Sequence, residues 1–257
     1  MNLIFYKYQG TGNDFVIVDN RLKTFPKKNT AIISHLCDRH FGIGADGLIL
    51  LEDDEETDFK MVYFNADGNE STMCGNGGRC IVAFAKQLEL IGNKTTFMAV
   101  DGLHSAAIKE DQVSLQMKDV DAIEISENYT FLDTGSPHHV QIVNNLDDFL
   151  VVIAGRKLRN AYGNEGSNIN FVEKIDENYF DLRTYERGVE DETLACGTGA
   201  TAAAIAMHKT KQTLGNKIGI KVVGGELEVS FDESKGKYTN VFLKGPATFV
   251  FKGEIPI

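Results

Sequence analysis

Apolar and polar residues alternate along much of the chain, and this period of two predicts β-strands. In the first half the predicted strands are residues 2–9, 14–19, 46–52, 59–65, 94–100, 103–109 and 112–118. In the second half they are residues 127–133, 139–143, 168–174, 179–186, 217–223, 226–231 and 238–244. The strands outnumber the helical segments, so each half is expected to form a mixed sheet with few helices.

Helical periodicity is confined to residues 30–42, 78–90, 147–161 and 199–211. The segments 78–90 and 199–211 are apolar nearly all round in their first turns, which is typical of a helix inside a core. Each of these two segments follows a cysteine. The simplest arrangement is therefore a sheet curled around a central helix, with the cysteine at the N-terminal end of that helix.

One phrase occurs twice in the chain. "ESTMCGNG" at 70–77 and "ETLACGTG" at 192–199 place a glutamate four residues before a cysteine, at an offset of 122 residues. Further segments match in the same order at nearly the same offset, and they pair 10–18 with 133–143, 44–51 with 166–173 and 58–68 with 179–188. The last of these matches places Phe64 on Tyr185 and Asn65 on Glu186. Such a series indicates a tandem duplication of one unit.

The predicted fold is α/β of the α+β kind. It has two similar duplicated domains, each a mixed, curled β-sheet around a central helix, and the active site is expected in the cleft between them. The link 117–127 is charged and has little apolar periodicity, so the predicted domains are 1–117 and 118–247. The last strand, 248–257, has no counterpart in the second half and is a candidate to return to the first sheet.

The composition excludes several classes of function. A net charge of −11 argues against nucleic acid and against an anionic membrane as partners, because both attract basic surfaces. No apolar run approaches the roughly 20 residues of a membrane span. The first residues lack the order of a secretion signal, so the cytoplasm is the expected compartment. A small anionic or zwitterionic substrate stays possible, because a pocket's field comes from a few local groups.

The four cysteines are too few and too scattered for a disulfide scaffold, and their spacing does not suit a metal cluster; they are Cys37, Cys74, Cys80 and Cys196. The usual fate of a free cysteine is to serve as a small buried apolar residue. We expect that role for Cys37 and Cys80, which fall within helical patterns. The duplicated glycine context favours a chemical role for Cys74 and Cys196.

A cysteine at the start of a helix faces unpaired N–H groups and the positive end of the macrodipole, and both favour thiolate. Glycines on both sides of Asn76 and Thr198 allow the backbone N–H groups to form a cradle for a carboxylate. Two such thiols on opposite faces of one carbon could invert it, with one removing a proton and the other donating one. No lysine lies in a recognisable pyridoxal-phosphate setting, so we expect racemisation or epimerisation without a cofactor.

At these residues the sequence resembles the diaminopimelate epimerase family along nearly its whole length. The matching motifs are "GTGNDFVIVD", "FGIGADGLILL", "NADGNESTMCGNGGRC", "TGSPHHV", "SNINFV" and "YERGVEDETLACGTGATAAA". The resemblance implies an enzyme that interconverts LL-2,6-diaminopimelate and meso-diaminopimelate in lysine and peptidoglycan precursor synthesis. It also implies a homodimer that binds this small molecule.

The resemblance also assigns roles by position. It implies that Cys74 and Cys196 are the acid–base pair, and that His138 and Glu186 tune their thiols. The helix-start amides that meet the substrate carboxylate are implied at Gly75, Asn76, Gly197 and Thr198. The residues implied to hold the distal end of the substrate are Asn13, Asn65, Asn168, Glu186 and Arg187.

The chain departs from the family pattern at Gly47, where some members have glutamine, and at Ser136, where many have asparagine. Ser136 shortens the reach of an expected hydrogen bond or leaves it to water. Two alternatives to the implied function stay open. One is racemisation of another amino acid on the same fold. The other is a non-catalytic protein that binds an amino acid or senses redox through its cysteines.

Overall fold

The computed structural model describes residues 2–71 and 74–257. The chain forms two compact units, Met1–Leu115 with Gly245–Ile257, and Gln116–Lys244. The elements of the first unit are β1 (Asn2–Gly10), β2 (Asn13–Asp19), α1 (Thr30–Cys37), β3 (Gly47–Glu52), β4 (Phe59–Asn65), α2 (Gly75–Gln87), β5 (Lys94–Ala99), β6 (Gly102–Lys109), β7 (Gln112–Gln116) and β17 (Thr248–Pro256). Their pairing order is β17-β1-β2-β3-β4-β5-β6-β7, with β2–β3 and β4–β5 parallel and the other pairs antiparallel.

The second unit contains β8 (Ile123–Ile125), β9 (Thr130–Asp133), β10 (Pro137–Ile142), η1 (Leu146–Asp148), α3 (Val151–Ala161), β11 (Asn168–Asp176), β12 (Tyr179–Glu186), β13 (Asp191–Thr193), α4 (Gly197–Lys209), β14 (Lys217–Val222), β15 (Gly225–Ser234) and β16 (Lys237–Pro246). Its order is β8-β9-β10-β11-β12-β14-β15-β16. The pairs β10–β11 and β12–β14 are parallel and the others in this order are antiparallel, which is the pattern of the first unit again. The predicted duplication of a mixed sheet is confirmed.

Strand register supports the alignment of the two halves. Leu48 of β3 lies opposite Phe64 of β4, and Ile169 of β11 lies opposite Tyr185 of β12. Both residues of the second pair follow those of the first by 121 positions, as the match of Phe64 with Tyr185 predicts.

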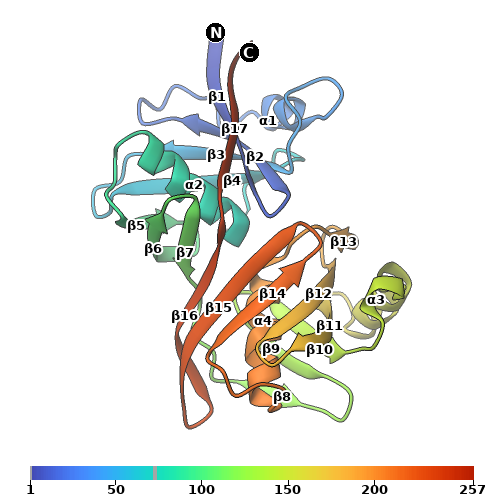
Figure 1. The fold of residues 1–257 in the computed structure, drawn as a ribbon. Coiled ribbons are helices and arrows are strands. Elements are labelled where there is room, and N and C mark those ends of the chain that lie inside the picture. The colour runs from blue at the N-terminus through green and yellow to red at the C-terminus, as the bar shows by residue number, and fades with distance from the viewer. Residues whose placement is uncertain (1, 72–73) are drawn as a thin grey trace. The chain divides into compact units, whose positions relative to one another are not determined.

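Each sheet curls around one helix. α2 packs against β1, β2, β3, β4, β6 and β17, and α4 packs against β9, β10, β11, β12, β14 and β15 (Figure 1). α4 is built largely from small buried residues such as Ala203 and Ala204, which allow the surrounding strands to approach its backbone closely. The predicted central helices are confirmed, and each begins directly after its cysteine.

Several predicted helix boundaries were wrong. The helix predicted at 30–42 ends at Cys37, because the Asp38 carboxylate accepts from the N–H groups of His40 and Phe41, each at 2.7 Å, and turns the chain. The segment 147–161 divides into η1 and α3. The central helices begin at Gly75 and Gly197, earlier than predicted, because the glycines of their first turns lack an apolar side chain that would mark the helix.

The prediction that the last strand has no counterpart was also wrong. β17 pairs with β1, and β8 pairs with β9 at the corresponding edge of the second sheet. β8 lies inside the link predicted at 117–127. Its three residues are half-buried or exposed, and a strand so short leaves no measurable period in the sequence.

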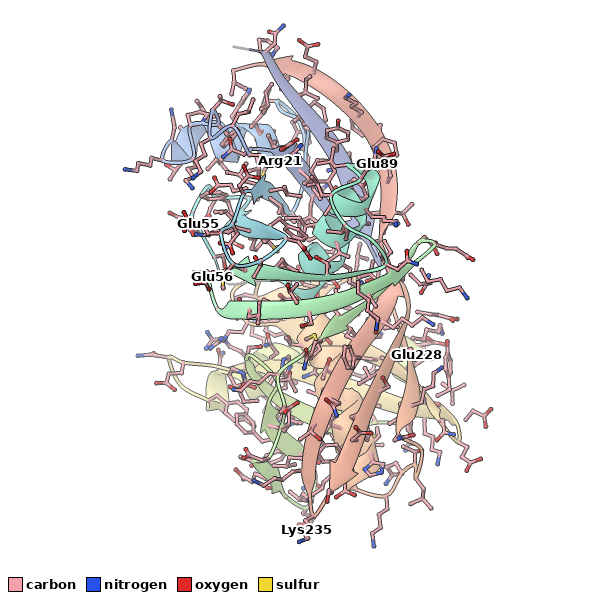
Figure 2. All side chains as sticks on the ribbon, turned by 90° about the vertical axis from the view of Figure 1, so that its left-hand side faces the viewer. Arg21, Glu55, Glu56, Glu89, Glu228 and Lys235 are labelled. Carbon is pink, nitrogen blue, oxygen red and sulfur yellow. The ribbon has the colours of Figure 1, made fainter. Side chains whose placement is uncertain are left out.

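Charged side chains cover the outer surfaces of both units. Glu55 and Glu56 are exposed on the acidic loop between β3 and β4, and Lys235 lies at the tip of the β15–β16 hairpin (Figure 2). Within the described residues, no helix has the length and apolar character needed to cross a membrane.

Candidate active site

The first half-site is built on the hairpin between β1 and β2. Its two central residues, Thr11 (φ 52°) and Gly12 (φ 85°), both have positive φ, as a tight two-residue turn requires. This conformation is rare for a β-branched threonine. Nη2 of Arg79, from the first turns of α2, donates to Oγ1 of Thr11 at 3.1 Å. The hairpin is thereby fastened to the helix that follows Cys74.

Cys74 is the N-cap residue of α2, and its backbone is extended. Its Sγ lies 3.5 Å from Oδ1 of Asn13, in the geometry of a thiol donating to an amide oxygen. The same oxygen accepts from Nδ2 of Asn76 at 3.1 Å. Cys74 is partly exposed. The first thiol is therefore reachable from solvent and faces a hydrogen-bond acceptor.

A network of charges lies on the other side of Asn13. Nδ2 of Asn13 donates to Asp46 Oδ2 at 2.5 Å, and Arg39 bridges Asp46 and Asp14 at 2.7 Å each. Lys7 adds an ion pair with Asp14 at 2.7 Å. Burial raises the pKa of Asp14, but the hydrogen bonds from Arg39 and Lys7 outweigh it and lower the pKa to about 2. The Asp14 carboxylate is therefore ionised at neutral pH.

Arg79 is completely buried, and its Nε donates to the carbonyl of Pro246 at 3.3 Å. Burial lowers its pKa, whereas the neighbouring sulfurs of Cys80 and Cys74 raise it. Burial also raises the pKa of Cys80 to about 12, and that of Cys37 to about 12. Both cysteines are thus buried neutral thiols, as expected from their helical contexts.

The second half-site presents its thiol differently. Cys196 is the N-cap residue of α4, and its Sγ accepts from the N–H of Gly199 at 3.4 Å. Oγ1 of Thr198 lies 3.5 Å from the same sulfur. Thr134, in the β9–β10 hairpin, donates to the carbonyl of Thr198 at 2.9 Å and so fastens this hairpin to α4.

His138 on β10 is fully buried in the same unit. Its Nε2 lies 3.1 Å from Ser136 Oγ, and its Nδ1 lies 3.1 Å from Nδ2 of Asn170. Burial lowers the pKa of His138 to about 3. At neutral pH the ring is therefore neutral, with Nδ1 accepting from Asn170 and Nε2 donating to Ser136. Ser136 reaches its partners directly in spite of its short side chain.

Asn168, at the start of β11, connects several predicted site residues. Its Nδ2 donates to Ser136 Oγ at 2.9 Å, and its Oδ1 accepts from the N–H of Arg187 at 2.9 Å. The Arg187 guanidinium donates to the carbonyl of Glu165 at 2.9 Å. Glu186 accepts from Thr193 Oγ1 at 3.0 Å. Ser136 and Asn168 thus connect His138 with Arg187, whereas Glu186 is bonded to Thr193.

The model of the family described as diaminopimelate epimerase matches residues 5–122 and 130–250. The chain belongs to the diaminopimelate epimerase family. It is 65% identical to the diaminopimelate epimerase of Flavobacterium psychrophilum, over 97% of this chain and 99% of that protein. It is 42% identical to the diaminopimelate epimerase of Chlorobaculum tepidum, over 96% of this chain and 99% of that protein. The resemblance inferred from the motifs is confirmed.

Solved structures with low sequence identity share the fold. A phenazine biosynthesis protein of the PhzF family from Bacillus anthracis has a TM-score of 0.80 at 14% identity, with both chains fully covered. A hydroxyproline epimerase from Agrobacterium vitis has a TM-score of 0.72 at 15% identity, covering 99% of this chain and 92% of that chain. At such identities the likeness concerns the architecture alone.

The position where some diaminopimelate epimerases carry glutamine cannot hold a side chain here. Gly47 lies opposite Asn65 at the ends of β3 and β4, and Asn65 is exposed. A Cβ at Gly47 would lie 2.5 Å from the ring of Tyr63 and 2.6 Å from the carbonyl of Phe64. Tyr63 therefore takes the space of the missing side chain.

Three residues that contact predicted site residues were not singled out in the sequence analysis: Asp46 and Arg79 in the first unit and Asn170 in the second. Each lies inside a quoted motif, "GADG", "GGRC" and "SNINF", so the motifs marked them without giving a role. Their partners are Asn13, Thr11 and His138, which lie 33, 68 and 32 residues away in the sequence. Strand pairing and the packing of α2 against the sheet bring such pairs together.

Proposed function

We propose that the protein interconverts LL-2,6-diaminopimelate and meso-diaminopimelate without a cofactor, with Cys74 and Cys196 as the acid–base pair. The observation that carries this proposal is the repeated placement of a cysteine at the start of a central helix, in a chain 65% identical to a diaminopimelate epimerase. We infer a cytoplasmic homodimer serving lysine and peptidoglycan precursor synthesis, as the family implies.

In this mechanism one cysteine, as thiolate, takes the α-proton of the substrate and becomes a thiol. The other thiol gives its proton to the opposite face of the carbon and becomes a thiolate, so one proton leaves and one arrives. The carbanion between these steps is stabilised at its carboxylate by the N–H groups at the starts of α2 and α4, next to Asn76 and Thr198. No redox step is required.

The distal amino-acid end is assigned to Asn65, Asn168, Glu186 and Arg187. A guanidinium suits the distal carboxylate, and the amide and carboxylate oxygens suit the distal ammonium. Asn13, also assigned to this end by the resemblance, lies 3.5 Å from the Cys74 sulfur, so we place its action at the reacting carbon.

His138 and Glu186 are proposed to tune the thiols rather than to exchange protons with the substrate. For His138 the support is its complete burial and a pKa lowered by that burial to about 3, which keep the ring neutral. Its partner Asn170 lies beside the start of α4, since a Cβ on Gly199 would be 2.5 Å from Asn170 Oδ1.

The proposal is tested by incubating the protein with LL-diaminopimelate in deuterated water without pyridoxal phosphate. The expected result is formation of meso-diaminopimelate carrying deuterium at the inverted α-carbon. Cys74→Ala and Cys196→Ala should each abolish epimerisation, while the control Cys37→Ala, a buried thiol of α1, retains it. Epimerisation that survives either single substitution would contradict the two-thiol assignment. Turnover of proline or hydroxyproline in place of diaminopimelate would contradict the substrate assignment.

A further inference from the structure

The side-chain amide of Asn13 has a defined orientation in the first half-site. Its nitrogen points to Asp46 Oδ2 at 2.5 Å, and its oxygen points to Cys74 Sγ and to Asn76 Nδ2. A carboxylate can only accept hydrogen bonds, so Asp46 selects the nitrogen end of the amide. The oxygen end must then face the thiol.

Asp46 is itself held in place. Its Oδ1 accepts from Arg39 Nη2 at 2.7 Å, and its Oδ2 also accepts from the N–H of Asp14 at 3.1 Å. The guanidinium of Arg39 also donates to both carboxylate oxygens of Asp14, from Nη2 at 2.7 Å and from Nη1 at 3.1 Å. Charge-assisted bonds of this kind are short and directional, so the Asp46 carboxylate offers Asn13 a fixed acceptor.

We propose that Asp46 is a positioning residue that fixes the Asn13 amide with its oxygen toward Cys74, so that the free protein holds Cys74 as a hydrogen-donating thiol. An acceptor beside sulfur favours S–H over S⁻, because the thiolate would face the negative end of the amide dipole. The consequence for catalysis rests on the proposed role of Cys74, whereas the orientation of the Asn13 amide does not depend on that role.

The second half-site has no equivalent of this device among its described residues. Ser136 takes the place of Asn13, and its hydroxyl is bonded to His138 and Asn168. Cys196 instead accepts from the N–H of Gly199, an arrangement that favours thiolate. Asp46 therefore contributes to a difference in protonation between the two thiols. Inversion requires this difference, because one thiol must act as the acid and the other as the base.

Other charged and titratable groups act on Cys74 as well. Arg79 and Cys80 on α2 interact electrostatically with Cys74. Lys7 and Tyr8 on β1, Asp14 on β2 and Arg39 lie on the elements around α2 or in the Asp46 network. The charge of Arg79 favours thiolate and opposes the effect of Asn13. The remaining titratable groups on strands packed against α2 are Tyr6, Asp19, Glu52, Lys60, Tyr63, His104, Lys109, Lys252 and Glu254. A substitution at Asp46 leaves all of these groups in place. The direction in which it shifts the pH midpoint of Cys74 alkylation therefore does not depend on them.

The test is Asp46→Asn, with the rate of Cys74 carboxymethylation followed against pH by peptide mass spectrometry in the absence of substrate. The introduced amide can donate as well as accept, so the Asn13 amide is free to turn and present its nitrogen to the sulfur. The expected result is a midpoint lowered by about half to one pH unit, since one hydrogen bond to the charged form shifts such an equilibrium by this order. Cys196 in the same sample serves as the internal reference and should not move.

A merely structural role for Asp46 would give a different result. Loosening of the hairpin would raise the limiting alkylation rate at high pH without lowering the midpoint. Asn13→Ser, which installs the residue of the second half-site and leaves Asp46 intact, should lower the midpoint to a similar extent. Combining Asn13→Ser with Asp46→Asn should add nothing further, because both act through one amide.

Asp19→Asn is the matched control. Asp19, at the end of β2, also pairs with an arginine, Arg21, and lies at the opposite end of the strand from Asn13. This substitution should leave the Cys74 midpoint unchanged. An unchanged or raised midpoint in Asp46→Asn would overturn the proposal. These alkylation results do not depend on turnover, so they stand apart from a failure of the epimerase assay.

Discussion

The two half-sites repeat one backbone arrangement and differ in the polarity of the hydrogen bond at sulfur. In the first unit, Cys74 donates to the oxygen of Asn13 at 3.5 Å. In the second unit, Cys196 accepts from the N–H of Gly199 at 3.4 Å. Duplication supplies two thiols at two helix starts, but inversion requires that one is a base while the other is an acid. The polar side chains around the two sulfurs differ, and this difference can favour thiol at one cysteine and thiolate at the other.

The hairpins that support the two helices show the same divergence. Thr11 is bonded by the buried guanidinium of Arg79, whereas Thr134 donates directly to the backbone of Thr198 at 2.9 Å. The residue equivalent to Arg79, 122 positions later, is Thr201, which donates to the carbonyl of Gly197 within α4. A positive charge is thus placed beside one thiol and not at the equivalent position of the other.

The largest predicted difference between the half-sites concerns the second glycine of each cysteine phrase. A Cβ at Gly199 would lie 2.5 Å from Asn170 Oδ1 and 3.2 Å from Cys196 Sγ. A Cβ at Gly77 would lie 3.1 and 3.3 Å from the terminal carbons of Ile49 and Met61, and at ordinary contact distance from Phe15. Gly199→Ala should therefore lower kcat/KM by about 100-fold, since displacing a reacting group by about 1 Å costs that much.

Gly77→Ala is the matched control and should retain most of the activity. The stability cost of Gly199→Ala should be about 2 kcal/mol, as for other overpacked sites, and urea unfolding would measure it. Equal losses for the two alanine variants would mean that the two helix starts are sterically alike, contrary to the geometry.

The next difference concerns pH. The folded pKa of His138, about 3, lies below its ordinary value of 6.5 because of burial. Between these values the unfolded chain binds the additional proton, so stability falls as pH decreases from about 6.5 toward 3, by up to about 1.4 kcal/mol per pH unit. His138→Gln should remove most of this slope in urea unfolding measured at pH 7, 6 and 5. His35→Gln, on the exposed side of α1, should not; equal slopes in wild type and His138→Gln would contradict the burial argument.

The smallest difference concerns the fastening of the hairpins. Thr134→Val removes the donor to the Thr198 carbonyl and should destabilise the protein by about 1 kcal/mol, the usual net value of one hydrogen bond. Thr134→Ser keeps the hydroxyl and should restore most of that loss. If the serine and valine variants unfold at the same urea concentration, the hydroxyl is not what fastens the hairpin.

Much of the fold follows from patterns in the sequence. The period of two located most strands, and the repeated phrase at an offset of 122 residues predicted two similar units with cysteines at the starts of buried helices. The helix starts were misplaced because Gly75 and Gly197 carry no side chain to show a period. β8 was missed because three residues are too few to define one.

The candidate site was less accessible to sequence reasoning. Asn13, Asn168 and Arg187 could be chosen through the family motifs, but the orientation of the Asn13 amide depends on Asp46, which arrives through the parallel pairing of β2 with β3. Likewise the neutral state of His138 depends on complete burial, which no local pattern in "SPHHV" indicates. Motifs identify the groups, whereas their protonation depends on distant contacts.

The most direct test of the account is the pH dependence of carboxymethylation of both cysteines in the free wild-type protein. Arg79 favours thiolate at Cys74, but its bonded nitrogens donate to Thr11 and Pro246, whereas the Asn13 oxygen contacts the sulfur directly at 3.5 Å. The direct hydrogen bonds should therefore decide the order. The account predicts that Cys196 begins to react at a lower pH than Cys74. Equal midpoints, or a lower midpoint for Cys74, would contradict it.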